Sequence, residues 1–156
     1  MKTQINIRKA TDIDRAFIFE LSPRLAEVAQ LAWHTDEVIQ KMQDDYITAM
    51  LVKSAVPQIT LIAEINAKPY GFIHARSHTD SISGEVCGTI PLLAVLPKAQ
   101  GQGLGKLLIE SVEVWAKELG YRLLHLEVFA KNNKAYSFYQ QQGFTAETVH
   151  MIKNLN

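Results

Sequence analysis

The chain has 156 residues, of which 47% are hydrophobic, and its 16 basic and 16 acidic residues give a formal net charge of zero. This length and composition predict a single domain over residues 1–156, and the balanced charge offers no general field that would attract nucleic acid. The single cysteine, Cys87, excludes an internal disulfide and fits a reducing compartment. Without a signal-peptide core or a run of about 18 apolar residues, we expect a cytoplasmic protein that does not enter the membrane.

The first third of the chain predicts one strand followed by a helical region. Residues 4–8 alternate apolar and polar side chains, as a half-buried strand does. A helix begins at residues 11–12, restarts at the Ser-Pro pair 22–23, and gives way to another helix over about residues 34–53. Residues 10–50 contain eight acids and three bases, which indicates a solvated helix face or the cation-binding side of a site.

The middle of the chain predicts a hairpin and a further strand. Residues 58–65 and 70–76 are apolar runs of strand length, joined by a turn-rich tetrapeptide. After a polar loop, residues 85–96 form the next, antiparallel strand. Pro91 cannot donate to a strand ladder, so we expect an edge or a bulge at residues 90–92.

Three alternating glycines, Gly101, Gly103 and Gly105, link this strand to an amphipathic helix. The helix has apolar residues at helical spacing over residues 104–119 and stops at Gly120. The first turn of a helix leaves about four backbone N–H groups without partners and carries partial positive charge, which favours a bound anion. Glycines lack the Cβ atoms that would hold a phosphate away. The segment therefore predicts a diphosphate cradle.

The last part of the chain predicts a strand, a helix and a final strand. Residues 122–129 form a buried strand, residues 132–142 a helix ending at Gly143, and residues 144–152 the last strand. The strand before the glycines, the helix after them and the strand at residues 122–129 would form a right-handed β-α-β crossover.

Two well-known phosphate loops do not fit the glycine segment. A Walker A loop requires a glycine five residues before Gly105, where the chain has Gln100. It also requires Ser or Thr after Lys106, where the chain has Leu107. A dinucleotide fingerprint would place its last glycine on Lys106 or Leu108. Both motifs are therefore excluded.

The pattern that fits is Gln/Arg-x-x-Gly-x-Gly, formed by Gln100, Gly103 and Gly105. A second segment, residues 132–144, matches Asn-x-x-Ala-x-x-Phe/Leu-Tyr followed by Gly-Phe. Together the two segments resemble the acetyl-CoA signature of the GNAT family, the Gcn5-related N-acetyltransferases. The resemblance covers about residues 85–145 closely.

The resemblance implies an α/β fold whose central sheet is mixed and mostly antiparallel, with about six or seven strands, one splayed parallel pair and about four flanking helices. It implies acetyl-CoA as the co-substrate. In the family, the pantetheine arm of CoA bonds to the backbone of the splayed strand, which here is Leu93, Ala94 and Val95, and an N–H near Leu93 or Val95 polarises the thioester carbonyl. The diphosphate would lie against Gln100, Gly101, Gln102, Gly103, Leu104, Gly105 and Lys106.

The second segment supplies two further residues by resemblance. Asn132 would contact the CoA arm, although an asparagine at a helix start is also a common N-cap. Tyr139 would be the general acid that protonates the departing CoA thiolate, because a phenol with a pKa near 10 keeps its proton at neutral pH. The alternative role of Tyr139 is packing, together with Tyr136 and Phe138.

The acceptor amine requires a base or a water path, because an alkylamine with a pKa of about 10.4 is almost wholly protonated at pH 7. Glu85, near the start of the strand that leads to the site, is the first candidate for a general base. His74, His78 and Glu127 are further candidates to relay protons. Cys87 has no activating neighbour in the sequence, so we interpret it as a packed thiol. The five histidines show no metal-ligand spacing, and no metal site is predicted.

The sequence thus predicts an enzyme that transfers an acetyl group from acetyl-CoA to an amine, directly within a ternary complex. The acceptor is an amine of a small molecule or a peptide, and the acidic residues between positions 10 and 50 favour a cationic one. A non-catalytic acyl-CoA-binding or regulatory module is the alternative. A homodimer is compatible with the family, but no sequence feature establishes one.

Overall fold

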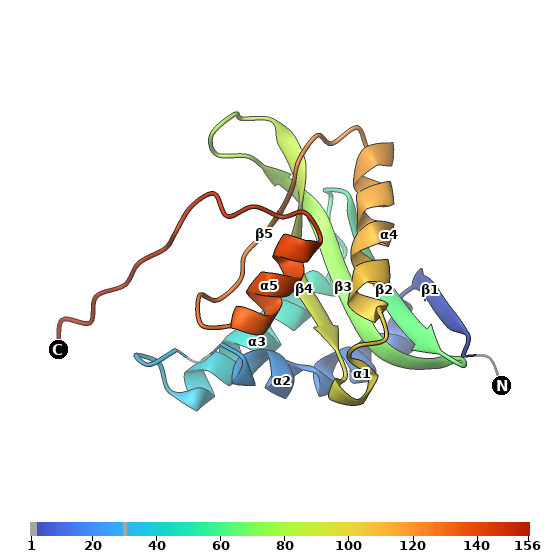
Figure 1. Cartoon of the computed structure of the whole chain (residues 1–156), viewed down its shortest axis with the longest axis horizontal. Helices are drawn as coiled ribbons and strands as arrows, with labels where there is room; N and C mark the ends of the chain where they lie inside the picture. Colours follow the sequence, from blue (N-terminus) through green and yellow to red (C-terminus); the bar gives the residue numbers. More distant parts are fainter. Residues whose placement is uncertain (1–2, 30) are drawn as a thin grey trace.

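The computed structural model describes residues 3–29 and 31–156, which form one mixed sheet with helices on both faces (Figure 1). The strand order is β1-β2-β3-β4-β5, and all neighbouring pairs are antiparallel except β4 and β5, which are parallel. None of the helices within the described ranges has the length and apolar character needed to cross a membrane. In chain order the elements are β1 (Ile5–Lys9), the 3₁₀-helix η1 (Asp12–Asp14), α1 (Arg15–Glu20), α2 (Ser22–Glu27), α3 (Asp36–Met50), β2 (Gln58–Ile65), β3 (Lys68–Thr79), β4 (Val86–Val95), the 3₁₀-helix η2 (Pro97–Ala99), α4 (Leu104–Glu118), β5 (Leu124–Leu126) and α5 (Asn133–Gln141).

Local sequence sets the ends of the N-terminal helices. Pro23 lies in the first turn of α2, where a missing N–H leaves no intrahelical bond unmade, and the predicted restart there is confirmed. Thr35 caps α3, because its hydroxyl oxygen accepts a hydrogen bond from the backbone N–H of Val38 at 3.3 Å.

A tight turn joins β2 to β3. Asn66 and Ala67 both have positive φ, 51° and 68°, as a two-residue turn of type I′ requires. The turn is shorter than the tetrapeptide predicted from the sequence. As a result, β3 begins at Lys68 instead of Tyr70.

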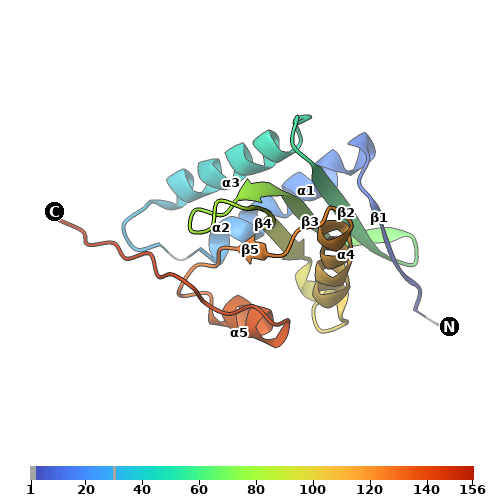
Figure 2. The same cartoon turned by 90° about the horizontal axis from the view of Figure 1, so that it is seen from above.

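Alternation along the central strands sends apolar side chains to both faces of the sheet. Leu61 of β2 and Ile73 of β3 pack with α4, whereas their neighbours Ile62 and Phe72 pack with α1 and α3. Figure 2 shows α1, α2 and α3 on one side of the sheet and α4 and α5 on the other. We call the first side the N-terminal face and the second the α4 face.

The strand β4 is irregular at its proline. In the ladder between β3 and β4, the two residues Ile90 and Pro91 stand opposite Ala75 alone. This is a β-bulge, in which the missing N–H of proline costs no ladder hydrogen bond. The predicted irregularity at residues 90–92 is confirmed.

The C-terminal part forms less sheet than the sequence predicts. β5 pairs only with Gly88–Ile90, and the strand expected over residues 122–129 is therefore reduced to three residues. Residues 144–152, expected as the last strand, pair with no strand of the described chain (Figure 1). The described sheet thus has five strands instead of about six or seven. A strand needs a neighbour that accepts and donates its backbone hydrogen bonds, and both segments lack one along most of their length.

Candidate active site

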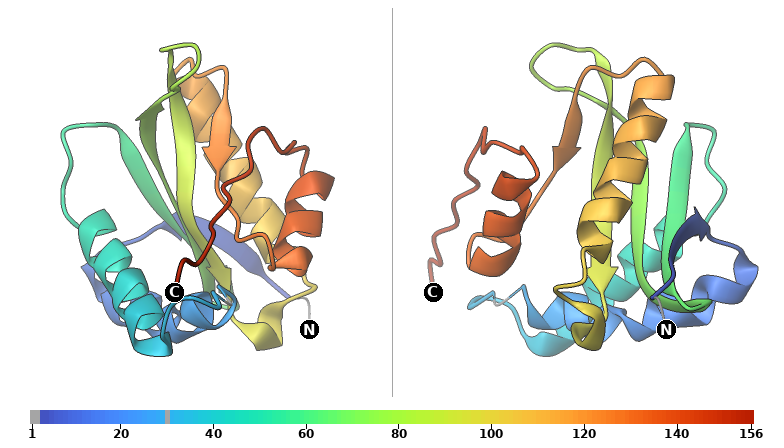
Figure 3. Two further views of the ribbon diagram at one scale, coloured as in Figure 1. Left: turned by 90° about the vertical axis from the view of Figure 1, so that its left-hand side faces the viewer. Right: turned by 45° about the vertical axis from the view of Figure 1, so that its right-hand side comes forward.

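The parallel strands β4 and β5 separate within the sheet. Their ladder ends at Ile90 and Leu126, while β4 continues to Val95. Figure 3 shows the two strands diverging beyond this point. The backbone of Leu93, Ala94 and Val95 therefore lies outside the β4–β5 ladder, on the stretch of β4 where the family resemblance predicts contact with the pantetheine arm.

The glycine loop follows β4 directly and leads into α4. Gly101 and Gly103 have φ of 83° and 82°, in the left-handed region that glycine adopts readily, and Gly103 caps the 15-residue helix α4. A Cβ built on either residue would meet no other atom within 4 Å. The space beside the loop is therefore open, as a cradle for a diphosphate requires, and the first-turn N–H groups of α4 border it.

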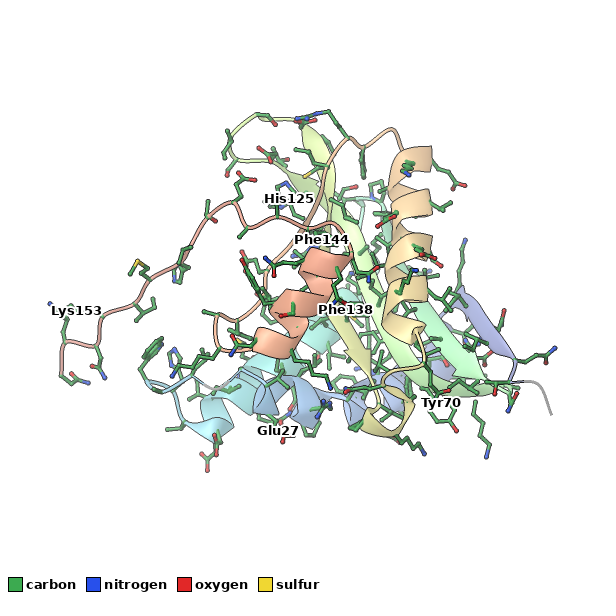
Figure 4. All side chains as sticks on the ribbon, viewed as in Figure 1. Glu27, Tyr70, His125, Phe138, Phe144 and Lys153 are labelled. Atoms are coloured by element: carbon green, nitrogen blue, oxygen red, sulfur yellow. The ribbon has the colours of Figure 1, made fainter. Side chains whose placement is uncertain are left out.

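Gly105 serves a different purpose from the other two glycines. A Cβ at this position would lie 3.1 Å from Cζ of Phe138, which belongs to α5. Figure 4 shows Phe138 between α5 and α4. The missing side chain of Gly105 thus lets α5 approach the start of α4, and this packing role was not predicted from the sequence.

Two polar contacts tie the loop to the rest of the site. The side-chain oxygen of Gln100 accepts a hydrogen bond from Nζ of Lys134 at 2.8 Å, which connects the loop to α5. The side-chain nitrogen of Gln100 lies 3.5 Å from the carbonyl oxygen of Val95. Gln100 therefore links the end of β4, the glycine loop and α5 in one place.

Asn132 and Tyr139 occupy the start and the middle of the α5 segment. Asn132 is the N-cap of α5, because its Oδ1 accepts a hydrogen bond from the backbone N–H of Ala135 at 3.2 Å. The ring of Tyr139 packs against Phe138 and Phe144, with centroid distances of 5.5 Å and 5.9 Å. Burial raises the pKa of Tyr139 to about 12, so its hydroxyl keeps its proton throughout the physiological range.

Glu85 lies at the opposite end of β4 from the glycine loop. Arg122 donates to its carboxylate with Nε and Oε2 3.1 Å apart, and the hydroxyl of Ser83 donates to Oε1 at 2.8 Å. These bonds, that from Arg122 foremost, lower the pKa of Glu85. Glu85 and Leu93 are eight positions apart, which corresponds to about 26 Å of extended strand. The structure therefore does not bring this candidate base next to the loop or Tyr139.

The other histidine and cysteine candidates lie in or near the sheet. His74 is fully buried in β3, where Thr60 Oγ1 lies 2.8 Å from its Nδ1, and burial lowers its pKa to about 4. Cys87 is buried opposite His78 in the ladder, and burial raises the pKa of its thiol, as a packed thiol requires. Glu127 is exposed, just beyond β5.

A carboxylate-imidazole pair that the sequence did not reveal lies beside the divergence of β4 and β5. Nε2 of His125 is 3.0 Å from Oδ2 of Asp80, and the ring of His78 lies beside that of His125, tilted by 60°, with the ring centroids 5.5 Å apart. The backbone N–H groups of Ile82 and Ser83 donate to Asp80 and lower its pKa. Because an ionised carboxylate only accepts hydrogen bonds, Nε2 of His125 carries a proton in this contact, and in the neutral imidazole Nδ1 is then the acceptor.

The position of His125 follows from the strand register. His125 pairs with Thr89, one residue before the ladder ends. Its neighbours Leu124 and Leu126 pack against the α4 face, so alternation turns His125 toward the N-terminal face. Asp80 and His125 are 45 residues apart in the chain, and only the pairing of β3, β4 and β5 brings them together. No local motif signalled this pair.

Comparison with known proteins assigns the chain to a family. The model of the Acetyltransferase (GNAT) family matches residues 22–144, and the chain belongs to this family. The resemblance identified in the two sequence segments is thereby confirmed. Within residues 3–29 and 31–156, no group of three or more His, Cys, Asp or Glu side chains is arranged to hold a metal ion.

Related sequences include enzymes that share part of their length with this chain. A mycothiol acetyltransferase from Jonesia denitrificans is 37% identical over 93 residues, which are 60% of this chain and 28% of that protein. The uncharacterized N-acetyltransferase YhfO of Bacillus subtilis is 31% identical over 99 residues, which are 62% of this chain and 66% of that protein. The match thus spans about a quarter of the first relative and just under two thirds of the second.

Solved structures confirm the fold over the whole chain. A putative acetyl transferase from Pyrococcus furiosus has a TM-score of 0.80 at 20% identity, with 97% of this chain and 100% of that chain covered. An aminoglycoside N-acetyltransferase, AAC(6')-Iy in complex with CoA, has a TM-score of 0.71 at 19% identity, with 100% and 98% covered. At these identities the likeness is one of fold.

Proposed function

We propose that the protein is an acetyl-CoA-dependent N-acetyltransferase that moves the acetyl group to an amine by direct transfer in a ternary complex. The divergence of β4 and β5 beside the glycine cradle carries this proposal. Exposed backbone groups on β4 suit an extended amide-bearing arm, and open space beside Gly101 and Gly103 suits a diphosphate. CoA thioesters combine both chemical features. The CoA complex of a relative in fold supports the same donor.

Different groups of the site would stabilise the oxyanion, protonate the leaving sulfur and orient the CoA arm. Nitrogen attacks the thioester carbon, so that a C–N bond forms and the C–S bond breaks. A backbone N–H of Leu93 or Val95 would stabilise the negative charge on the carbonyl oxygen by about 3 kcal/mol. Tyr139 would give its phenolic proton to the departing sulfur, and its raised pKa ensures that the proton is present at neutral pH. Asn132 would orient the CoA arm while it caps α5.

For the second proton, which leaves the attacking nitrogen, we propose His125 as the acceptor. Asp80 fixes the tautomer of His125 through the 3.0 Å contact. His125 pairs with Thr89 in the β4–β5 ladder, and Thr89 is about 13 Å along β4 from Leu93. The proton would therefore pass from the attacking nitrogen to His125 through ordered water. Glu85 stays a candidate base, but its bonds to Arg122 and Ser83 favour a structural role.

For the acceptor, we propose a cationic amine of a small molecule or a peptide. His125 faces the same side of the sheet as the helices α1, α2 and α3, which lie within the acidic stretch of residues 10–50. Excess negative charge attracts and orients an amine that arrives protonated. The named activities of the relatives, on mycothiol and aminoglycosides, support a small-molecule acceptor.

The deciding experiment measures thiol release from acetyl-CoA with a panel of amines: an aminoglycoside, a polyamine, free amino acids and a peptide with a free α-amine. We expect at least one amine to release CoA with equimolar formation of its acetamide. Acetyl-CoA binding without any release across the panel would favour the non-catalytic acyl-CoA-binding module. No binding at millimolar acetyl-CoA would contradict both functions.

A further inference from the structure

A row of polar side chains crosses four strands of the sheet. Gln58 of β2 pairs with Arg76 of β3, and Arg76 pairs with Thr89 of β4. Thr89 in turn pairs with His125 of β5. Directly paired residues project from the same face of a sheet, and here it is the N-terminal face, because Phe72, four residues before Arg76 in β3, packs there. The polar row, as we call it, thus brings an amide, a guanidinium, a hydroxyl and an imidazole into one line.

The helices of the N-terminal face leave the polar row accessible. His74, one position nearer the glycine loop on the same face, is fully buried. In contrast, Arg76 and His78 are exposed, and Thr89 is half-buried. The cover over this face therefore ends between His74 and Arg76. A molecule that binds on the N-terminal face beside β4 and β5 can reach the polar row.

Arg76 contributes a positive charge that no carboxylate of residues 3–29 and 31–156 neutralises through an ion pair. Arg8 in β1, for comparison, is paired, with its Nη1 2.8 Å from Oδ2 of Asp14. After burial, the charge of Arg76 is the second cause of the lowered pKa of His74, so the guanidinium lies close enough to act on that imidazole. A guanidinium presents its N–H donors in a fork that matches the two oxygens of a carboxylate. Arg76 is therefore suited to bind a carboxylate from outside the chain.

The polar row lies at a defined distance from the position proposed for acetyl transfer. Thr89 and Leu93 are four positions apart, which corresponds to about 13 Å along β4. An extended peptide advances about 3.3 Å per residue, so four residues cover the same distance. Arg76 lies on the neighbouring strand, about 5 Å from Thr89. A peptide whose α-amine reacts near Leu93 can therefore place its C-terminal carboxylate beside Thr89 and Arg76.

We propose that Arg76 is a specificity-determining residue, which binds the carboxylate of an acceptor whose amine and carboxylate are separated by about 13 Å, as in a tetrapeptide. This inference rests on the proposed acetyltransferase function and narrows its acceptor to an amine that also carries a carboxylate. The hydroxyl of Thr89 would donate a second hydrogen bond to the same carboxylate. The acidic residues between positions 10 and 50 would attract the amine end, so the two ends of the acceptor meet opposite charges.

Equilibrium binding of peptides to the protein with CoA bound tests this inference without reference to acetyl transfer. The probes are tetraglycine and tetraglycine amide, which differ only in the terminal carboxylate, and titration calorimetry measures both affinities. We expect tetraglycine to bind about tenfold more tightly than its amide. Arg76→Gln should bind both peptides with the affinity of the amide, and Arg76→Lys should regain part of the preference, since it restores the charge without the fork.

Two controls separate the carboxylate contact from general effects of charge and length. Lys117→Gln removes one positive charge from an exposed position of α4, on the other face of the sheet, and should keep the tenfold preference. Diglycine is about half as long as tetraglycine, so its two ends cannot reach both positions. It should therefore bind no more tightly than diglycine amide.

Three outcomes would overturn the proposal. The first is equal affinity of the unmodified protein for tetraglycine and its amide, or binding of neither. The second is a tenfold preference that persists in Arg76→Gln, and the third is the same preference for diglycine over its amide. Thiol release with the amine panel, combined with any of these outcomes, would reject the carboxylate site and leave the acetyltransferase function in place. Absence of thiol release, combined with a preference that depends on Arg76, would reject the transfer function instead.

Discussion

Tyr139 can be tested as the acid without disturbing its packing. Tyr139→Phe keeps the ring contacts with Phe138 and Phe144 and removes only the hydroxyl. We expect kcat to fall by about 100-fold, the lower range for a positioned acid, with the Kd for acetyl-CoA unchanged within about twofold. Tyr136→Phe, on the exposed side of α5, is the control and should keep its activity. Equal kcat in Tyr139→Phe and the unmodified enzyme would refute the acid role.

Glu85 and His125 are the two proposed bases, and variants of these residues and of Asp80, the partner of His125, separate them. His125→Gln should lower kcat/KM by about 100-fold and flatten the acid limb of its pH profile. Asp80→Asn should lower it less, because the imidazole stays but loses the partner that fixes its tautomer. Glu85→Gln should leave the profile unchanged. A flattened acid limb in Glu85→Gln, with a normal one in His125→Gln, would assign the base to Glu85 instead.

His74 makes the fold sensitive to mild acid. Its pKa is about 4 in the folded protein, against an ordinary 6.5, so between these values the unfolded chain binds a proton that the folded chain does not. The free energy of unfolding therefore falls as the pH drops, by about 2 kcal/mol between pH 7 and pH 5. Urea unfolding at both pH values should show this loss, and His74→Gln should reduce it. His34→Gln, at an exposed histidine, should retain the full loss.

At the scale of elements, alanine substitutions in the glycine loop and in a distant loop can be compared directly, because the two glycines have similar backbone conformations. Gly103 and Gly84 have φ of 82° and 75°, and a Cβ on either would meet no atom within 4 Å. Alanine at either position should cost about 1–2 kcal/mol of stability, because both backbones are left-handed. Only Gly103→Ala should also weaken acetyl-CoA binding, by tenfold or more in calorimetry, since its methyl enters the proposed diphosphate space. Equal affinities for the two variants would move that space away from Gly103.

The elements that the sequence predicted well are those fixed by local chemistry. The helix start in the segment 34–37, the restart at Pro23 and the bulge at Pro91 each depend on neighbours within a few residues, and each is present. The length of β5 and the absence of a paired last strand depend on where other strands lie. Residues 122–129 and 144–152 have strand sequences, but strand formation also needs a partner, which the local pattern does not report.

In the candidate site, too, features set by local sequence were predictable and features set by contacts between distant residues were not. The positive φ of Gly101 and Gly103 and the N-cap role of Asn132 follow from short segments and were predictable. The contact of Gly105 with Phe138, 33 residues away, was not. Nor were the Asp80–His125 and Glu85–Arg122 pairs, because each joins side chains whose proximity exists only after β3, β4 and β5 align.

At the scale of the whole molecule, acetyl-CoA should act as a stabiliser. A ligand present at 100 times its Kd adds about 2.7 kcal/mol to the free energy of unfolding. For a chain of this size, that corresponds to a rise in Tm of about 5–10 °C. Differential scanning fluorimetry with and without acetyl-CoA measures the rise, and Gly103→Ala should show less of it at the same ligand concentration. An unchanged Tm at saturating, millimolar acetyl-CoA would contradict binding.

The buried members of both hydrophobic core clusters all come before residue 113: Ala94 is the last buried member of one, and Val112 of the other. The residues after α4 add only partly buried side chains, and in α5 no side chain, including that of the half-buried Tyr139, is fully buried. We call β5 and α5 the C-terminal lobe, and it should open locally at a lower free energy than the body formed by the preceding elements. The proposed acid, Tyr139, lies in this C-terminal lobe, and a ligand bound between the lobe and the body would hold that acid in place.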